Sequence, residues 1–110
     1  MSNNSIRSFT FHKDEIGVSN GNTMTVNSNE AIMTLEANSV GTVTLVFEGM
    51  GTLGVWRPIY GVNLTTIDLV ISTSDITPFY QFDLSGLTKI RIKILANSGS
   101  PTSVVGKIVG

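Results

Sequence analysis

Hydrophobic and polar residues alternate with a period of two over most of this 110-residue chain. The clearest case is the segment 89–94, where Ile90, Ile92 and Ile94 share one face and the intervening residues are Lys and Arg. Period two is the side-chain repeat of a β-strand, and one apolar face opposite one polar face is typical of an antiparallel sheet. The pattern therefore predicts strands that bury one face.

Further strands are predicted wherever this alternation recurs. The clearer ones lie at 42–48, 67–71 and 80–84, and weaker ones at 6–11, 22–26, 31–37, 54–60 and 103–109. Segments rich in Gly, Asn and Ser separate them, and Asn20-Gly21 is a hairpin candidate because both residues tolerate positive φ. No credible helix is predicted, since Pro78 disfavours helical backbone in the best candidate, 75–79. Eight or nine short strands predict an all-β fold, an antiparallel, jelly-roll-like β-sandwich.

The apolar positions of the clearer strands define the expected core. They are Val43, Leu45, Phe47, Phe82, Leu84, Ile90, Ile92 and Ile94. In the segment 67–71, Ile67, Leu69 and Ile71 are expected to share a face. The length is that of one domain, so residues 1–110 are predicted to form a single sandwich. Residues 1–12 are a candidate N-terminal arm because the segment begins with Asn and Ser, and chain ends fray.

Charge is unusually scarce and changes the picture of the surface. Charged residues make up 14% of the chain, against about 25% in an average soluble domain, and the formal net charge is −1. This balance argues against a nucleic-acid binder and against an electrostatic membrane-surface protein, because both need a basic excess. Net charge near zero also promotes association, so we expect a closed homo-oligomer or docking onto a larger assembly.

The residues that carry chemistry form no catalytic or metal-binding pattern. His12 is the only histidine and lies in the expected arm, where a solvated side chain is the simpler interpretation. The eight carboxylates are scattered, and Glu48, Asp68 and Asp83 fall on outward strand positions. There is no cysteine, which excludes disulfides and thiolate metal sites. The chain is therefore predicted to be no enzyme and to need no cofactor or metal.

No targeting or membrane segment is expected. Residues 1–5 lead into no apolar stretch of the kind that forms a secretory signal, and the longest apolar runs are too short to span a bilayer.

The segments 42–49, 55–59, 79–92 and 104–109 together resemble a small β-sandwich module of tailed-bacteriophage virion proteins. The likeness covers mainly residues 43–110, and its most specific part is the run 80–88 before the alternating basic strand. The resemblance implies a non-enzymatic structural or accessory protein of the tail, baseplate or capsid surface, located in the virion and bound to other virion proteins. Residues 1–40 carry no such likeness.

Aromatic residues supply the candidate binding site, for which we name Trp56, Arg57, Tyr60 and Tyr80. Flat rings suit the faces of sugars, so Trp56, Tyr60, Phe79 and Tyr80 could form a platform for a cell-surface glycan, and a carbohydrate-binding module is the alternative function. The simpler interpretation places Trp56 in the core, as is usual for a lone Trp in a small β domain. Because strand neighbours point to opposite faces, Arg57 is then expected to point outward.

Overall fold

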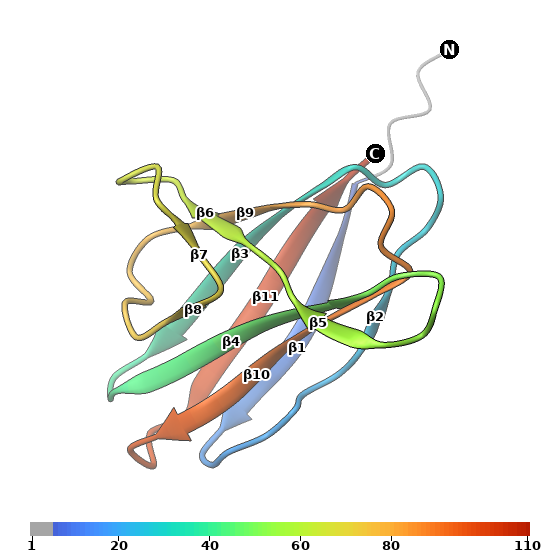
Figure 1. Cartoon of the computed structure of the whole chain (residues 1–110). Helices are drawn as coiled ribbons and strands as arrows, with labels where there is room; N and C mark the ends of the chain where they lie inside the picture. The colour runs from blue at the N-terminus through green and yellow to red at the C-terminus, as the bar shows by residue number, and fades with distance from the viewer. Residues whose placement is uncertain (1–5) are drawn as a thin grey trace.

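The computed structural model describes residues 6–110 of the chain. This part contains eleven β-strands joined by turns and loops (Figure 1). They are β1 (Ile6–Glu15), β2 (Met24–Thr25), β3 (Ile32–Ser39), β4 (Val43–Met50), β5 (Trp56–Pro58), β6 (Gly61–Asn63), β7 (Leu69–Val70), β8 (Ser72–Thr73), β9 (Tyr80–Asp83), β10 (Lys89–Asn97) and β11 (Thr102–Val109). These described residues include no helix that is long and apolar enough to cross a bilayer.

The strands form two antiparallel sheets that lie face to face. One has six strands in the order β1-β11-β3-β9-β6-β7, and the other has the order β2-β10-β4-β5, with β8 as a further partner of β4. The predicted all-β sandwich is confirmed. The structure has more strands than expected because β6 and β8 are only three and two residues long, which is too short for a period to show.

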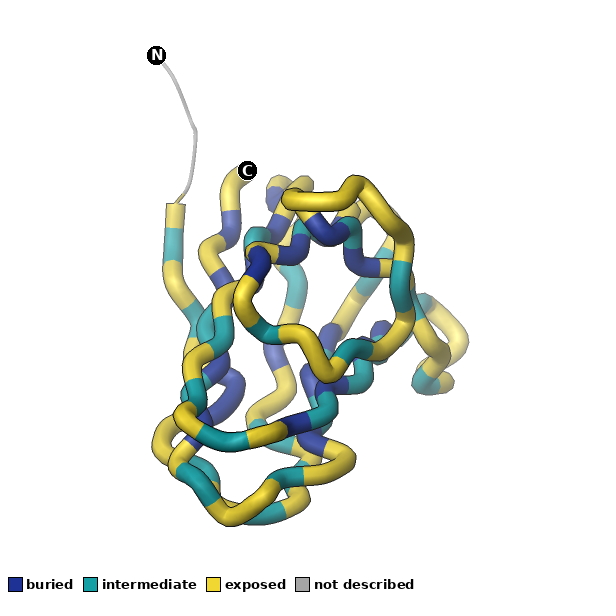
Figure 2. The backbone as a smooth tube through the Cα atoms, turned by 90° about the vertical axis from the view of Figure 1, so that its left-hand side faces the viewer, coloured by how far each residue is buried: buried dark blue, intermediate teal, exposed yellow. Residues whose placement is uncertain are grey.

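The core lies between the two sheets. Figure 2 shows buried positions alternating with exposed ones along the strands. All eight expected core residues are buried, each at most 2% exposed. Phe47 packs edge-on against Phe82, with ring centroids 4.9 Å apart. The alternation in the longer strands therefore identified the buried face correctly.

The expected N-terminal arm is part of a sheet in its described part, since residues 6–12 belong to β1, which pairs with β11 (Figure 1). Residues 1–5 lie outside the described residues. Phe11 is 1% exposed and joins the core. His12, expected to be solvated, is 4% exposed, and its Nε2 lies 2.6 Å from the carbonyl oxygen of Ile92. Since a carbonyl only accepts hydrogen bonds, Nε2 carries the proton.

Two other local expectations are wrong. Asn20-Gly21 makes no tight hairpin, because β1 and β2 on either side of it belong to different sheets. The expected strand at 67–71 is reduced to Leu69–Val70, and Ile67, Leu69 and Ile71, expected to share a face, are 70%, 62% and 43% exposed. Ile67 has a φ of 64° and so lies in a turn, and the residue that packs on the core is Val70.

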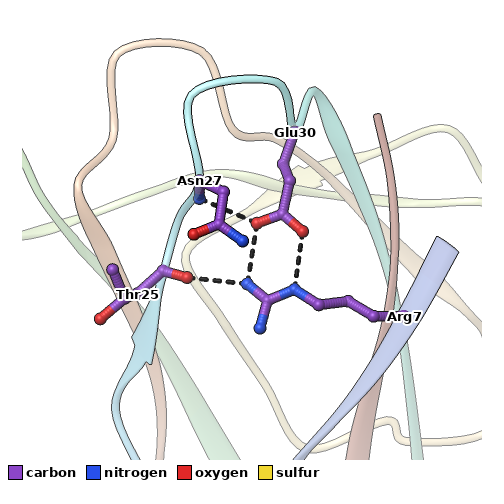
Figure 3. Close-up of polar contacts among 4 residues, drawn as sticks. All are labelled: Arg7, Thr25, Asn27 and Glu30. Atoms are coloured by element: carbon purple, nitrogen blue, oxygen red, sulfur yellow. Dashed lines mark hydrogen bonds and ion pairs between the residues drawn. The ribbon is translucent and has the colours of Figure 1, made fainter. Parts of the chain in front are cut away.

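An ion pair closes one open side of the sandwich (Figure 3). Arg7 of β1 donates through Nε to Glu30 Oε2 at 2.6 Å, and through its terminal nitrogen to Glu30 Oε1 and the Thr25 carbonyl, both at 2.8 Å. The backbone N–H of Asn27 also donates to Glu30 Oε1. The hydrogen bonds from Arg7 hold the pKa of Glu30 below its ordinary value, although burial of the carboxylate opposes this.

Candidate functional site

The structure separates the four candidate binding residues instead of gathering them. Trp56 is half-buried and Arg57 is exposed, both on β5. Tyr60 follows β5 and is 64% exposed, whereas Tyr80 of β9 is 3% exposed. They therefore lie in three environments, which are described in turn.

Trp56 lies on the outer face of the five-stranded sheet and not in the core. The guanidinium of Arg91 stacks over its ring, 4.1 Å from the ring centroid. Arg91 Nε donates in turn to Glu48 Oε1 at 2.8 Å, and Lys93 Nζ lies 3.8 Å from the same oxygen. The preferred placement of Trp56 in the core was thus wrong, because β5 pairs with β4 in the register that puts Trp56 opposite Met50, on the outward side.

Arg57 points to the opposite side of β5, where a pocket of about 360 Å³ opens. Its register partner is Gly49, which continues the inward series Val43, Leu45 and Phe47 along β4. The pocket is lined by Gly49, Gly51, Thr52, Leu53, Val55, Arg57, Pro58, Ile59 and Leu87. We call this the β5 pocket. Arg57 is the one charged residue among these lining residues.

Glycine at position 49 brings the neighbouring side chains close to the sheet. A Cβ added there would lie 2.9 Å from Ile59 Cγ2 and 3.1 Å from Leu87 Cδ2. The series of inward-facing side chains along β4 therefore ends at Gly49, which has no side chain. The end of the sandwich is filled from the side by Ile59 and Leu87, which leaves the β5 pocket beside them.

Tyr60 belongs to an exposed apolar surface at the edge of the six-stranded sheet. Val62 of β6 pairs with Leu69 of β7, while the alternate pair, Gly61 and Val70, faces the core. A Cβ at Gly61 would lie 2.8 Å from the Phe82 ring, which confirms that Gly61 faces inward. Val62 and Leu69 consequently share the outward side, and the exposed residues Tyr60 and Ile71 lie just before β6 and just after β7. We call these four residues the apolar flank. Leu69 and Ile71 are expected from the sequence to share a face with Ile67, but the sequence does not identify them as surface residues.

Tyr80 cannot take part in a surface platform because it is in the core. Its hydroxyl donates to the carbonyl oxygen of Asp75 at 2.6 Å and lies 2.9 Å from Thr73 Oγ1, so its polar atom is also occupied. The alternation of Tyr80, Phe82 and Leu84 already indicated this burial. The four-ring sugar platform is therefore not formed, and the Trp56 ring also has one face covered by Arg91.

Within residues 6–110, no three His, Asp or Glu side chains lie close enough together to hold a metal ion.

The comparisons with known proteins agree with this fold. A search of curated proteins finds no match. Two solved structures are similar over the whole chain. The SPBc2 prophage-derived protein YomS has 23% identity and a TM-score of 0.90, with 97% of its chain covered. The PBSX exported protein XepA has 24% identity and a TM-score of 0.94, and this chain spans 39% of its length.

The family model named XepA matches residues 5–108, which include the N-terminal segment where no likeness was expected. The match confirms a phage-derived β-sandwich at this coarser level, and it extends the resemblance from residues 43–110 to nearly the whole sequence. The chain therefore belongs to the XepA family, and the family's domain covers residues 5–108.

Proposed function

We propose that this protein is a non-enzymatic structural or accessory component of a phage particle, in the tail, the baseplate or the capsid surface. It acts by binding copies of itself and other virion proteins. The proposal concerns assembly and involves no catalytic step.

The apolar flank is the observation that carries this proposal. Tyr60, Leu69 and Ile71 are 64%, 62% and 43% exposed; Leu69 lies on the outward side of β7, and Tyr60 and Ile71 border the β6–β7 pair at its ends. Contiguous exposed apolar side chains are typical of protein–protein contacts, and tyrosine is enriched among residues that dominate such contacts. A second copy of the chain is the partner we propose for this surface, because a chain with a net charge of −1 has little electrostatic protection from self-association.

The family supports the phage origin. One relative carries the word "exported" in its name. The alternative to a location in the virion is therefore a protein that is free outside the particle.

Size-exclusion chromatography with light scattering tests the self-association. We expect the native protein to form a defined oligomer, and Leu69→Lys to weaken it by at least about tenfold because the substitution places a charge within the contact. Val18→Lys is the matched control, since Val18 is 70% exposed and lies in the connection from β1, at the opposite edge of the sheet order. A native protein that is monomeric at every concentration would remove the proposed contact.

Sedimentation of purified particles tests the place in the virion. The protein should co-sediment with particles of the phage that encodes it, and antibody labelling should assign it to the tail, the baseplate or the head. Recovery of all the protein in the particle-free medium would contradict the virion role and favour an exported one.

A further inference from the structure

The β5 pocket has an apolar lining with a single charged group. Ile59 and Leu87 pack against the core on one side, while Leu53 and Val55 are 85% and 48% exposed. A tight turn presents the last two, with Gly54 at a φ of 75° and its N–H donating to the Gly51 carbonyl. Covering such aliphatic side chains with an apolar group of a ligand removes them from water and therefore favours binding.

Arg57 differs from the other arginines of the described chain. Arg7 is paired with Glu30, and Arg91 is paired with Glu48. Within residues 6–110, Arg57 has no hydrogen bond or ion pair, and no carboxylate lines the β5 pocket. A guanidinium presents several donors in a planar fork that matches a carboxylate. The pocket therefore offers a guanidinium that can bind an anion beside an aliphatic surface that can bind an apolar group.

We propose that the β5 pocket binds a peptide segment of a partner protein in which an apolar side chain lies next to a carboxylate. The apolar side chain occupies the space between Leu53, Ile59 and Leu87, and the carboxylate accepts hydrogen bonds from Arg57. The volume of about 360 Å³ is near the lower end of ligand pockets, which suits one large side chain. Thr52 and the exposed backbone of the turn offer polar contacts that a peptide could use and a plain acyl chain could not.

This inference does not depend on the proposed assembly role, because it uses none of the residues of the apolar flank. An experiment that rules out peptide binding at the β5 pocket would not contradict the assembly role, and the reverse also holds.

Titration of the ¹⁵N-labelled protein, followed by NMR, tests the site. The probes are acetyl-Gly-Gly-Phe with a free carboxylate, the same peptide as its C-terminal amide, and octanoate. We expect the acid peptide to shift the amide signals of Gly49, Gly51, Leu53 and Leu87, and to bind about three- to tenfold more tightly than the amide, as an exposed ion pair allows. Arg57→Gln should abolish that preference. Lys107→Gln, which removes an exposed cation from β11 of the other sheet, should preserve it.

Each other result contradicts the proposal in a different way. Equal binding of acid and amide, or an unchanged preference in Arg57→Gln, would remove the role of Arg57. If octanoate binds as tightly as the acid peptide, the pocket does not select a peptide, and a small amphiphile is the better ligand class. Shifts that lie elsewhere, or none with any probe, would overturn the site. Preserved spectra of both variants away from the pocket would show that neither substitution acts by unfolding.

Discussion

Trp56 contributes to stability through a stacked cation and not through deep burial. One ring face lies against the Arg91 guanidinium, and the residue is half-buried on the outer face of the sheet. Trp56→Ala is therefore expected to lower the free energy of unfolding by only about 1–2 kcal/mol, since a partly exposed cation–π contact and part of the apolar area are lost. Phe82→Ala, at a residue 1% exposed, should cost about 3–5 kcal/mol. Urea denaturation of both variants measures the difference. A larger loss for Trp56→Ala would show that the indole lies in the core.

The alternation rule placed Trp56 and Arg57 correctly on opposite sides of a strand but assigned the sides the wrong way round. β5 has only three residues, so its own sequence holds too few positions to show which side is apolar. The side is set by the register with β4, where Trp56 lies opposite Met50, and by Arg91 on the next strand. Neither contact is visible from residues adjacent in the sequence. The exposure of Arg57 was expected, but the pocket beside it depends on Gly49, Ile59 and Leu87 coming together.

At the scale of elements, long regular strands were predictable and irregular ones were not. β4 keeps strict alternation throughout and β10 keeps it from Lys89 to Ile94, before its register with β4 shifts, and these buried faces followed directly from the sequence. β1 breaks the period, because its register with β11 shifts between Thr10 and His12. Consecutive residues Phe11 and His12 are both buried as a result. A sequence pattern of period two cannot anticipate a bulge, so the weak strand expected at 6–11 gave no sign of the buried Phe11–His12 pair.

The position of β1 in the sheet predicts how two phenylalanines differ. Phe11→Ala should destabilise the protein by about 3–5 kcal/mol because the ring is 1% exposed and packs with Phe9 at a centroid distance of 4.9 Å. Phe79→Ala should cost less than about 1 kcal/mol, since that ring is 51% exposed. Thermal unfolding followed by circular dichroism compares the two. Equal, small losses would mean that the segment 6–12 is indeed a detached arm.

For the whole molecule, the Arg7–Glu30 pair links β1 of one sheet to the connection that leaves β2 of the other (Figure 3). The pKa of Glu30 is lowered in the folded protein, so the unfolded chain binds its proton more readily. The stabilisation is complete above the unfolded pKa of about 4.3 and is lost as the pH falls through the lower folded value.

Acid titration of stability tests this link. Between about pH 5 and pH 3, the native protein should lose stability more steeply than Glu30→Gln. At neutral pH the substitution itself should cost about 1–3 kcal/mol, because it removes charge-assisted hydrogen bonds from a buried oxygen pair. Glu36→Gln is the control, as this side chain has no ion pair within residues 6–110. Parallel pH profiles for the native protein and Glu30→Gln would contradict the assignment.

The hydrogen bond from His12 has a consequence for solubility. β2 covers β10 only at Lys89 and Ile90, so the rest of that side of β10 would be a bare strand edge, onto which another chain could add. The His12 ring donates a hydrogen bond to the Ile92 carbonyl. The backbone N–H of Ser19 donates to the Ile94 carbonyl, and the Ile94 N–H donates to the Ser19 carbonyl. Backbone groups that would template a foreign strand are thus already occupied. In a protein with so little charge to keep copies apart, these bonds oppose the addition of a foreign strand along this side of β10.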